Sequence, residues 1–330
     1  MTRWTATDIP SQHVRTAIVT GTGGLGYEDA LALARAGSDV VLAGRNPRKG
    51  LKAVSQIRRQ VPSAKIRFEQ LDLADLDSVS VFAQRMRSQQ DSLDLLINNA
   101  GVMVPPRREM TRDGFELQLG TNYLGHFALT AQLMPLLRKG VKPRVISLSS
   151  IAARTGVIDF DDLNAERSYQ PMPVYSQSKL ACLMFALELQ RRSHAGGWGI
   201  TSIAAHPGIA RTDLLHNGPG RWSAHGLTRS MLAFLFQPAA QGALPALFAA
   251  TSLEAQGGAY YGPDRLSEAR GYPALAKVPP QALDEAAAAR LWEMSEALTC
   301  VQFAGIGSEG PGTFCTTPEA RYHSRLIPSY

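Results

Sequence analysis

The stretch TAIVTGTGGLGYEDALALARAG, residues 16–37, decides the fold class, because it reads as a strand, a glycine loop and a helix in direct succession. Its first part, TAIVTG, is a short apolar run rich in β-forming residues. The part from Leu25 onward has helical spacing and stops at Gly37. A helix that begins directly after such a loop can hold a pyrophosphate, since its first N–H groups are free and glycine allows close approach of the backbone.

The glycine loop, residues 20–26, fits two different patterns. Gly21, Gly23 and Gly26 satisfy G-x-G-x-x-G, which occurs in many nicotinamide and flavin enzymes. The same residues also fit T-G-x-x-x-G-x-G with one residue missing. A glycine pattern alone is a weak signal, so the loop leaves both interpretations open.

Further strands and helices alternate along the chain after this unit. We expect helices at 47–60 and 280–298, and strands near 39–44, 65–72, 94–101, 143–150, 199–208 and 257–264. Several strands are continuous apolar runs, which is typical of a parallel sheet covered on both faces. We therefore predict an α/β, Rossmann-type doubly wound sheet of about seven strands, formed by one domain over residues 1–303. Residues 304–330 are rich in Gly and Pro and predict a flexible tail or a partner-binding arm.

Composition narrows the class of protein. The 330 residues are 45% apolar and 19% charged, and the net charge of +6 is dispersed, which argues against nucleic-acid binding. No apolar run approaches the length of about 20 residues that spans a membrane, and the N-terminus lacks the apolar core of a signal peptide. The three cysteines and seven histidines show no metal-ligand spacing. These features favour a cytoplasmic protein without a metal.

The end of the second predicted strand indicates which cofactor is preferred. A site for NAD usually carries Asp or Glu there, on the ribose 2′-hydroxyl. This chain has Gly44 and Arg45, followed by Arg48 and Lys49. Guanidinium groups bind a 2′-phosphate through charge-assisted hydrogen bonds, so the sequence favours NADP(H) over NAD(H).

Tyr175 and Lys179 form a candidate proton-transfer pair. Their i,i+4 spacing places both side chains on one face of a helix. A free phenol is only about 0.1% ionised at pH 7, and a neighbouring ammonium favours the phenolate. Such a phenol can exchange a proton with an alcohol.

Together with NNAGVM (98–103) and YSQSK (175–179), an ordered series of motifs resembles the short-chain dehydrogenase/reductase family, and most closely its retinol-dehydrogenase branch. The resemblance runs from about residue 4 to about residue 303 and includes GRNPRKG, TNYLGHFALT, VISLSS and AAHPGIARTDL. It identifies the glycine loop as the T-G-x-x-x-G-x-G loop of that family, shortened by one residue. The cofactor contacts that the resemblance implies are Gly21, Gly24, Leu25, Gly26, Asp72, Leu73, Asn99, Ala100, Gly101, Tyr175, Lys179, Pro207, Gly208 and Thr212, beside Arg45 from the argument above.

The same resemblance implies the catalytic roles. Ser150 would polarise a carbonyl that takes hydride from NADPH, and Tyr175 would protonate the resulting alkoxide. Lys179 and Asn122 would support the proton relay. Ser149 is the alternative serine, but neighbouring strand residues point to opposite faces, so only one can reach the substrate.

The sequence defines the substrate-binding residues less clearly than the cofactor-binding residues. The segment 209–238 contains Met231, Leu232, Phe234, Leu235 and Phe236, which would suit either a hydrophobic substrate or a buried helix. The insert GVIDFDDLNAERSYQPMP (156–173) is expected at the rim of the pocket, and helix 280–298 would cover the pocket or form an interface, as in a homo-oligomer. Two alternatives remain: a non-catalytic NADP(H)-binding regulatory protein, and an epimerase or dehydratase of the same family.

Overall fold

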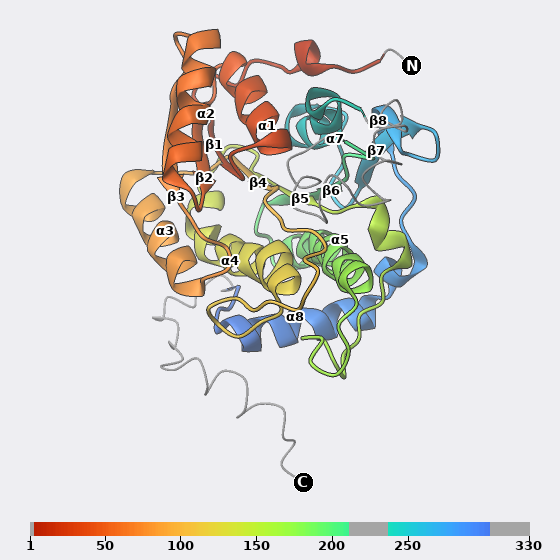
Figure 1. The fold of residues 1–330 in the computed structure, drawn as a ribbon. Helices are drawn as coiled ribbons and strands as arrows, with labels where there is room; N and C mark the ends of the chain where they lie inside the picture. Colours follow the sequence, from red (N-terminus) through yellow and green to blue (C-terminus); the bar gives the residue numbers. More distant parts are fainter. Residues whose placement is uncertain (1–2, 211–236, 304–330) are drawn as a thin grey trace.

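The computed structural model describes residues 3–210 and 237–303. Within these residues, eight strands form one sheet in the order β3-β2-β1-β4-β5-β6-β7-β8 (Figure 1). All neighbouring pairs are parallel except β7 and β8. The strands are β1 Thr16–Thr20, β2 Asp39–Gly44, β3 Ile66–Gln70, β4 Leu95–Asn98, β5 Arg144–Leu148, β6 Thr201–Ala205, β7 Tyr260–Arg265 and β8 Arg270–Leu275.

The predicted doubly wound α/β fold is confirmed, with one strand more than the seven expected. The additional strand is β8, whose sequence RGYPAL contains Gly271 and Pro273. Proline cannot donate to a β-ladder and is therefore confined to edge positions, which is where β8 lies. The same proline removes the apolar alternation from which a strand is predicted.

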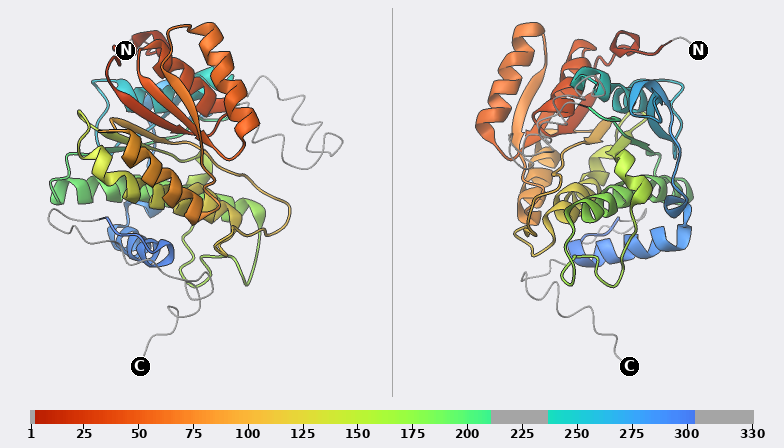
Figure 2. Two further views of the ribbon diagram at one scale, coloured as in Figure 1. Left: turned by 90° about the vertical axis from the view of Figure 1, so that its left-hand side faces the viewer. Right: turned by 45° about the vertical axis from the view of Figure 1, so that its right-hand side comes forward.

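Helices cover both faces of the sheet (Figure 2). One cluster of buried apolar residues lies under α1, α2 and α7, and the other under α3, α4 and α5. These helices, with α8, are α1 Gly24–Arg35, α2 Pro47–Gln60, α3 Leu76–Gln89, α4 Gly125–Leu137, α5 Pro171–Ala195, α7 Ala239–Thr251 and α8 Glu285–Thr299. Short helical turns are η1 Ala6–Asp8, the π-helix η2 Leu119–Leu124, η3 Ile151–Thr155 and η6 Pro280–Leu283.

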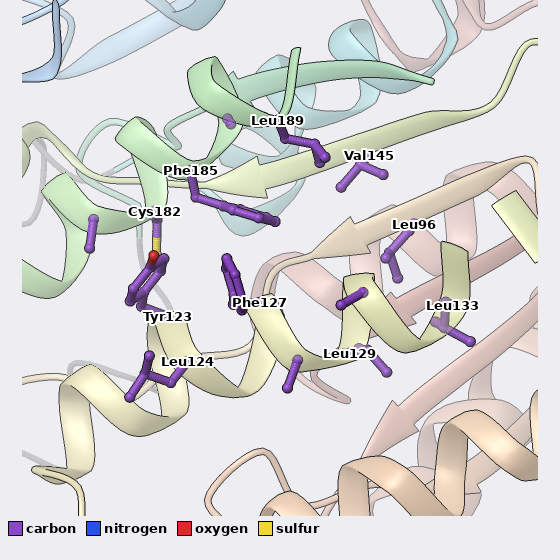
Figure 3. Packing of buried hydrophobic residues seen from close by; sticks show 14 of the residues in the cluster. Leu96, Tyr123, Leu124, Phe127, Leu129, Leu133, Val145, Cys182, Phe185 and Leu189 are labelled. Atoms are coloured by element: carbon purple, nitrogen blue, oxygen red, sulfur yellow. The ribbon is translucent and has the colours of Figure 1, made fainter. Parts of the chain in front are cut away.

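Helix α8 packs on the outer side of α4 and α5. Its Trp292 is 1% exposed and lies with ring centroids 5.1 Å from Phe127 and 5.7 Å from Phe185. Figure 3 shows Phe127 of α4 and Phe185 of α5 facing each other in this core. The helix therefore covers the α4–α5 layer, and none of its residues lines the cavity described below.

The order of the strands predicts a binding site at the carboxyl ends of β1 and β4. Strand order reverses between β1 and β4, which are neighbours in the sheet although two strands separate them in sequence. Ligands of open α/β sheets bind beyond the carboxyl ends of the strands at such a point. The glycine loop follows β1 directly, so it lies where a ligand is expected.

One buried carboxyl group in α1 gives a prediction about stability. Asp29 is fully buried, and neither carboxyl oxygen has a hydrogen-bond partner among the described residues. Burial, with the nearby charge of Glu28, raises the pKa of Asp29 well above its usual value. A carboxyl whose pKa is raised in the folded state favours folding at low pH, and this contribution is lost as pH rises through the folded pKa.

We therefore expect Asp29→Asn to gain stability relative to the wild type as pH rises from about 4, the ordinary pKa of an aspartate, to 9. Thermal unfolding across this range measures the difference in Tm. The exposed Asp91→Asn is the control, because its carboxyl is solvated in both states. A difference in Tm between Asp29→Asn and wild type that is constant over the whole range would contradict this assignment.

Candidate active site

A cavity of about 1100 Å³ lies at the carboxyl ends of the strands. Loops after β1 to β6 and the start of α5 contribute to its wall. It brings together most of the residues predicted from the sequence: Gly21, Gly24, Leu25, Arg45, Asp72, Leu73, Asn99, Ala100, Gly101, Ser150, Tyr175, Lys179, Pro207 and Gly208. Gly26 and Asn122 do not line it, and Thr212 lies outside the described residues.

The shortened glycine loop still leads directly into a helix. Gly21 and Gly24 have φ values of +95° and +52°, which residues with a side chain rarely adopt. The N-cap of α1 is Gly23, which has no side chain to satisfy the first N–H groups. These N–H groups and the positive end of the helix dipole suit an anion.

Gly26 packs beneath the glycine loop and does not line the cavity. A Cβ at this position would collide with the carbonyl of Gly21 and lie 2.6 Å from Nδ2 of Asn99. Nδ2 of Asn99 donates to the carbonyl of Thr20 over 2.7 Å. Gly26 therefore permits the close packing that joins the ends of β1 and β4.

Three cations gather at the end of β2. Arg45, Lys49 and Lys52 all line the cavity, beside the N-terminus of α2, where Oδ1 of Asn46 accepts the N–H of Lys49 over 3.1 Å. Lys52 was not predicted, although its i,i+3 spacing from Lys49 places it on the same face of α2. Thr22, which also lines the cavity, was not predicted either. A Cβ on Gly44 would lie 2.7 Å from Cγ2 of Thr22, so the side chain of Thr22 lies over the end of β2.

The ends of β1 and β4 are joined by a buried hydroxyl group. Oγ1 of Thr20 accepts the N–H groups of Asn99 and Ala100 over 2.9 and 3.0 Å, and lies 2.9 Å from Nε2 of His126. Nδ1 of His126 donates to the carbonyl of Asn122 over 2.9 Å. Burial lowers the pKa of His126 to about 4, so the ring is neutral. Because Nδ1 carries the ring proton, Nε2 accepts a hydrogen bond from the hydroxyl group of Thr20.

Tyr175 and Lys179 lie in the first turns of α5 and are 6% and 5% exposed. Nζ of Lys179 donates to the carbonyl of Leu148 at the end of β5 over 3.0 Å. Ser149 and Ser150 follow this strand and have different contacts. Oγ of Ser149 donates to the carbonyl of Lys179 over 2.7 Å, whereas Oγ of Ser150 accepts the N–H of Ala152 over 3.2 Å and has no other hydrogen bond to the described residues. The two neighbouring serines thus make different contacts, and the hydroxyl proton of Ser150 has no acceptor within the described part of the chain.

Asn122 lies in the π-helix that precedes α4 and is 1% exposed. Its side chain accepts the N–H of Val102 over 2.7 Å, and donates to the carbonyl of Val102 over 3.0 Å and to Oγ of Ser178 over 2.9 Å. These bonds fix the loop after β4 to α5. Asn122 therefore acts on the cavity through the residues that line it.

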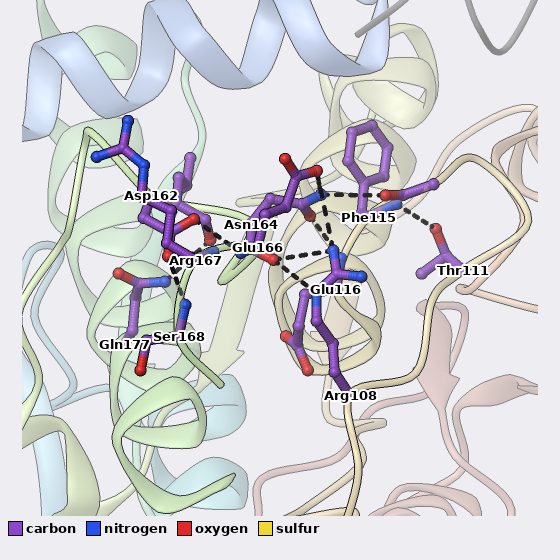
Figure 4. Close-up of polar contacts among 12 residues, drawn as sticks. Arg108, Thr111, Phe115, Glu116, Asp162, Asn164, Glu166, Arg167, Ser168 and Gln177 are labelled. Atoms are coloured by element: carbon purple, nitrogen blue, oxygen red, sulfur yellow. Dashed lines mark hydrogen bonds and ion pairs between the residues drawn. The ribbon is translucent and has the colours of Figure 1, made fainter. Parts of the chain in front are cut away.

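The insert 156–173, expected at the rim of the pocket, is joined through polar contacts to the segment that precedes η2 (Figure 4). Oδ1 of Asn164, in the insert, accepts the N–H of Glu116 over 2.6 Å, and its carbonyl accepts two bonds from Arg108. From this insert, only Met172 lines the cavity, and it is 50% exposed. The cavity wall also includes the apolar residues Val102, Met103, Ile151 and Ala152.

Comparison with known proteins identifies the family. The short chain dehydrogenase family model matches residues 15–219. Mouse polyprenol dehydrogenase is 39% identical over 309 residues, covering 92% of this chain and 88% of that protein. Mouse retinol dehydrogenase 13 is 40% identical over 305 residues, covering 90% and 87%. A solved structure of an uncharacterized protein from Mycobacterium Paratuberculosis has a TM-score of 0.76 at 38% identity, covering 92% of this chain and 100% of that one.

The chain belongs to the short-chain dehydrogenase family, in the branch of the retinol dehydrogenases. The family assignment makes it an oxidoreductase, in agreement with the resemblance seen in the sequence. In the described part of the chain, no helix is long and apolar enough to cross a membrane. The described residues also contain no group of three or more His, Cys, Asp or Glu side chains placed to hold a metal ion.

Proposed function

We propose that this protein is an NADP(H)-dependent oxidoreductase that interconverts a carbonyl and an alcohol on a hydrophobic small molecule. The observation that carries this proposal is the convergence on one cavity of Ser150, Tyr175 and Lys179 at one end and three cations at the other. The small-molecule substrate would lie against the apolar wall beside Met172.

The residues of the cavity fit a dinucleotide with a 2′-phosphate. At the glycine loop, the free N–H groups of α1 would hold the pyrophosphate. Arg45, Lys49 and Lys52 would bind the 2′-phosphate, with Asp72 and Leu73 near the adenine. Asn99, Ala100 and Gly101 would lie along the ribose, and Pro207 and Gly208 near the nicotinamide, with Thr212 as a further contact.

The side chains at the nicotinamide end would transfer the proton and stabilise the charge that develops on the substrate oxygen. The nicotinamide, when bound, supplies or accepts hydride. Ser150 would donate a hydrogen bond to the carbonyl oxygen and stabilise charge on it. Tyr175 would give its phenolic proton to this oxygen during reduction and take it back during oxidation. Lys179 would hold the ribose and favour the phenolate, with Asn122 supporting the proton relay behind it.

The apolar wall favours a hydrophobic substrate. Two similar proteins bear the names polyprenol dehydrogenase and retinol dehydrogenase 13, and both names denote long apolar alcohols. We propose that substrates of this chemical class, as alcohols or aldehydes, occupy the site here. The cytoplasmic location predicted from the cysteine pattern is part of the same proposal.

The cofactor preference is tested by Arg45→Ala. We expect NADPH to bind more tightly than NADH to the wild type, and this preference to fall by roughly 10–100-fold in the variant, the worth of a hydrogen bond between charged groups. Nicotinamide fluorescence titration with both cofactors measures it. Arg48→Ala is the matched control, because Arg48 is exposed in the first turn of α2, three residues after Arg45, and does not line the cavity. Equal binding of NADPH and NADH to the wild type would refute the NADP(H) preference.

The two alternatives give different results in a turnover assay. A non-catalytic NADP(H)-binding protein would bind the cofactor and convert no substrate. An epimerase or dehydratase would form product without net consumption of NADPH. Measuring NADPH and product together therefore separates the three functions.

A further inference from the structure

A partly buried polar cluster lies next to the proposed nicotinamide end of the cavity. It consists of Arg154 in η3, His206 after β6, Tyr260 in β7 and Glu268 in the turn between β7 and β8. His206 and Tyr260 are 1% and 3% exposed. None of the four lines the cavity. The side chains of Arg154 and Glu268 are 31% and 19% exposed. Buried polar groups such as those of His206 and Tyr260 need polar partners within the protein.

Glu268 is the centre of the cluster. Its Oε2 accepts a hydrogen bond from Nε2 of His206 over 2.9 Å and forms an ion pair of 2.6 Å with Arg154. Its Oε1 accepts the N–H of Lys277 over 2.9 Å. Burial acts to raise the pKa of Glu268, but these partners outweigh it and lower the pKa to about 2. Glu268 is therefore an anion shared by two different loops.

One side of the cluster reaches the loop at the nicotinamide end. Nδ1 of His206 accepts the N–H of Gly208 over 3.2 Å, which fixes the proton of this ring on Nε2, toward Glu268. Gly208 has a φ of +63°, and a Cβ there would collide with the carbonyl of Ala269. The same carbonyl accepts the N–H of Ile209 over 2.7 Å. The β7–β8 turn thus supports both the backbone and the histidine of this loop.

The other side of the cluster reaches the serine. Tyr260 lies with its ring 5.1 Å from that of His206, and its hydroxyl donates to the carbonyl of Ser150 over 3.3 Å. Arg154 lies in the turn that follows Ser150 and also donates to the carbonyl of Ser267 over 3.2 Å. Tyr260 thus contacts the serine directly, and Arg154 ties the turn that follows the serine to the β7–β8 turn.

The backbone of the turn is unusual. Leu266, Ser267 and Glu268 have φ values of 50°, 53° and 67°, the left-handed conformation that residues with a side chain rarely adopt. Such a conformation persists only where the surroundings impose it. Here the ion pair, the histidine and the loop carbonyls supply those constraints.

We propose that Glu268 is a positioning residue that fixes Ser150 and the Pro207–Gly208 loop relative to each other, and so sets the distance between the carbonyl-binding hydroxyl and the nicotinamide. Glu268 is a single anion that contacts both segments, through Arg154 on the side of Ser150 and through His206 on the side of Gly208. The kinetic part of this proposal rests on the proposed function, whereas the structural part does not.

The first test is hydrogen–deuterium exchange of the ligand-free protein. In Glu268→Ala, peptides covering residues 150–156 and 206–210 are both expected to take up deuterium faster, while peptides of α3 are unchanged. Glu268→Gln keeps one acceptor oxygen and is expected to restore part of the protection. Glu293→Ala, an exposed glutamate of α8, is the control. Faster uptake confined to the turn itself would overturn the proposal.

The second test is steady-state reduction of decanal and all-trans-retinal by NADPH. Glu268→Ala is expected to lower kcat at least tenfold and to change KM for the aldehyde less than threefold, with partial recovery in Glu268→Gln. An unchanged kcat in an active enzyme would overturn the positioning role. If the wild type reduces neither aldehyde, the proposed function fails for this substrate class, and the exchange result still decides whether Glu268 couples the two loops.

Discussion

A Tyr175→Phe variant is expected to bind NADPH like the wild type and to lose at least 100-fold in kcat. The phenol is the proton donor and acceptor in the proposed reaction, and a positioned acid or base contributes roughly 10²–10⁴-fold. The substitution removes one hydroxyl from a side chain that is 6% exposed, so the ring still fills its place in α5.

The measurement is NADPH oxidation with an aldehyde substrate, together with the dissociation constant for NADPH from fluorescence. Tyr272→Phe is the matched control, because Tyr272 lies in β8 and does not line the cavity. Wild-type turnover by Tyr175→Phe would remove this residue from the mechanism.

The second large effect is expected for Lys179→Met. This lysine is proposed both to favour the phenolate and to bind the ribose, so its loss should lower kcat/KM by at least 1,000-fold. It should also raise the dissociation constant for NADPH roughly 10–100-fold, as expected for one hydrogen bond from a charged group. Cofactor binding thus distinguishes Lys179→Met from Tyr175→Phe.

We expect Lys179→Met to fold like the wild type. Nζ of Lys179 is buried and donates to one carbonyl, that of Leu148. Replacing a buried ammonium by an apolar chain of similar length removes a desolvation penalty. Circular dichroism and Tm check that the variant folds, and Lys139→Met, at an exposed site after α4, serves as the control. Unchanged NADPH affinity in Lys179→Met would contradict the ribose-binding role.

Most of the site residues predicted from the sequence line the cavity, and most of these were implied by the family resemblance. Each predicted segment follows a strand, and parallel strands bring their carboxyl ends to one edge of the sheet. Gly21, Asp72, Asn99 and Ser150 therefore meet although up to 129 positions separate them. The i,i+4 spacing likewise predicted the shared helix of Tyr175 and Lys179, which the structure confirms.

Contacts between distant segments could not be predicted in this way. Thr20 and His126 are 106 residues apart, and His206 and Glu268 are 62 apart. Neither pair has a periodic pattern that connects its members. The edge strand β8 was not predicted, because Gly271 and Pro273 interrupt the sequence pattern that is typical of a strand. Of the predicted substrate segment, residues 211–236 lie outside the described residues, as do the predicted tail 304–330 and the first two residues.

The central claim is that Ser150, Tyr175 and Lys179 carry out NADPH-dependent reduction of an apolar carbonyl compound. The most direct measurement is to incubate the protein with NADPH and all-trans-retinal or decanal, and to quantify NADP⁺ and the alcohol formed. The two products are expected in a ratio of one to one, and both are expected to form at least 100-fold more slowly with Tyr175→Phe. Tight NADPH binding with no turnover of any apolar aldehyde or alcohol would contradict it and favour the non-catalytic regulatory protein.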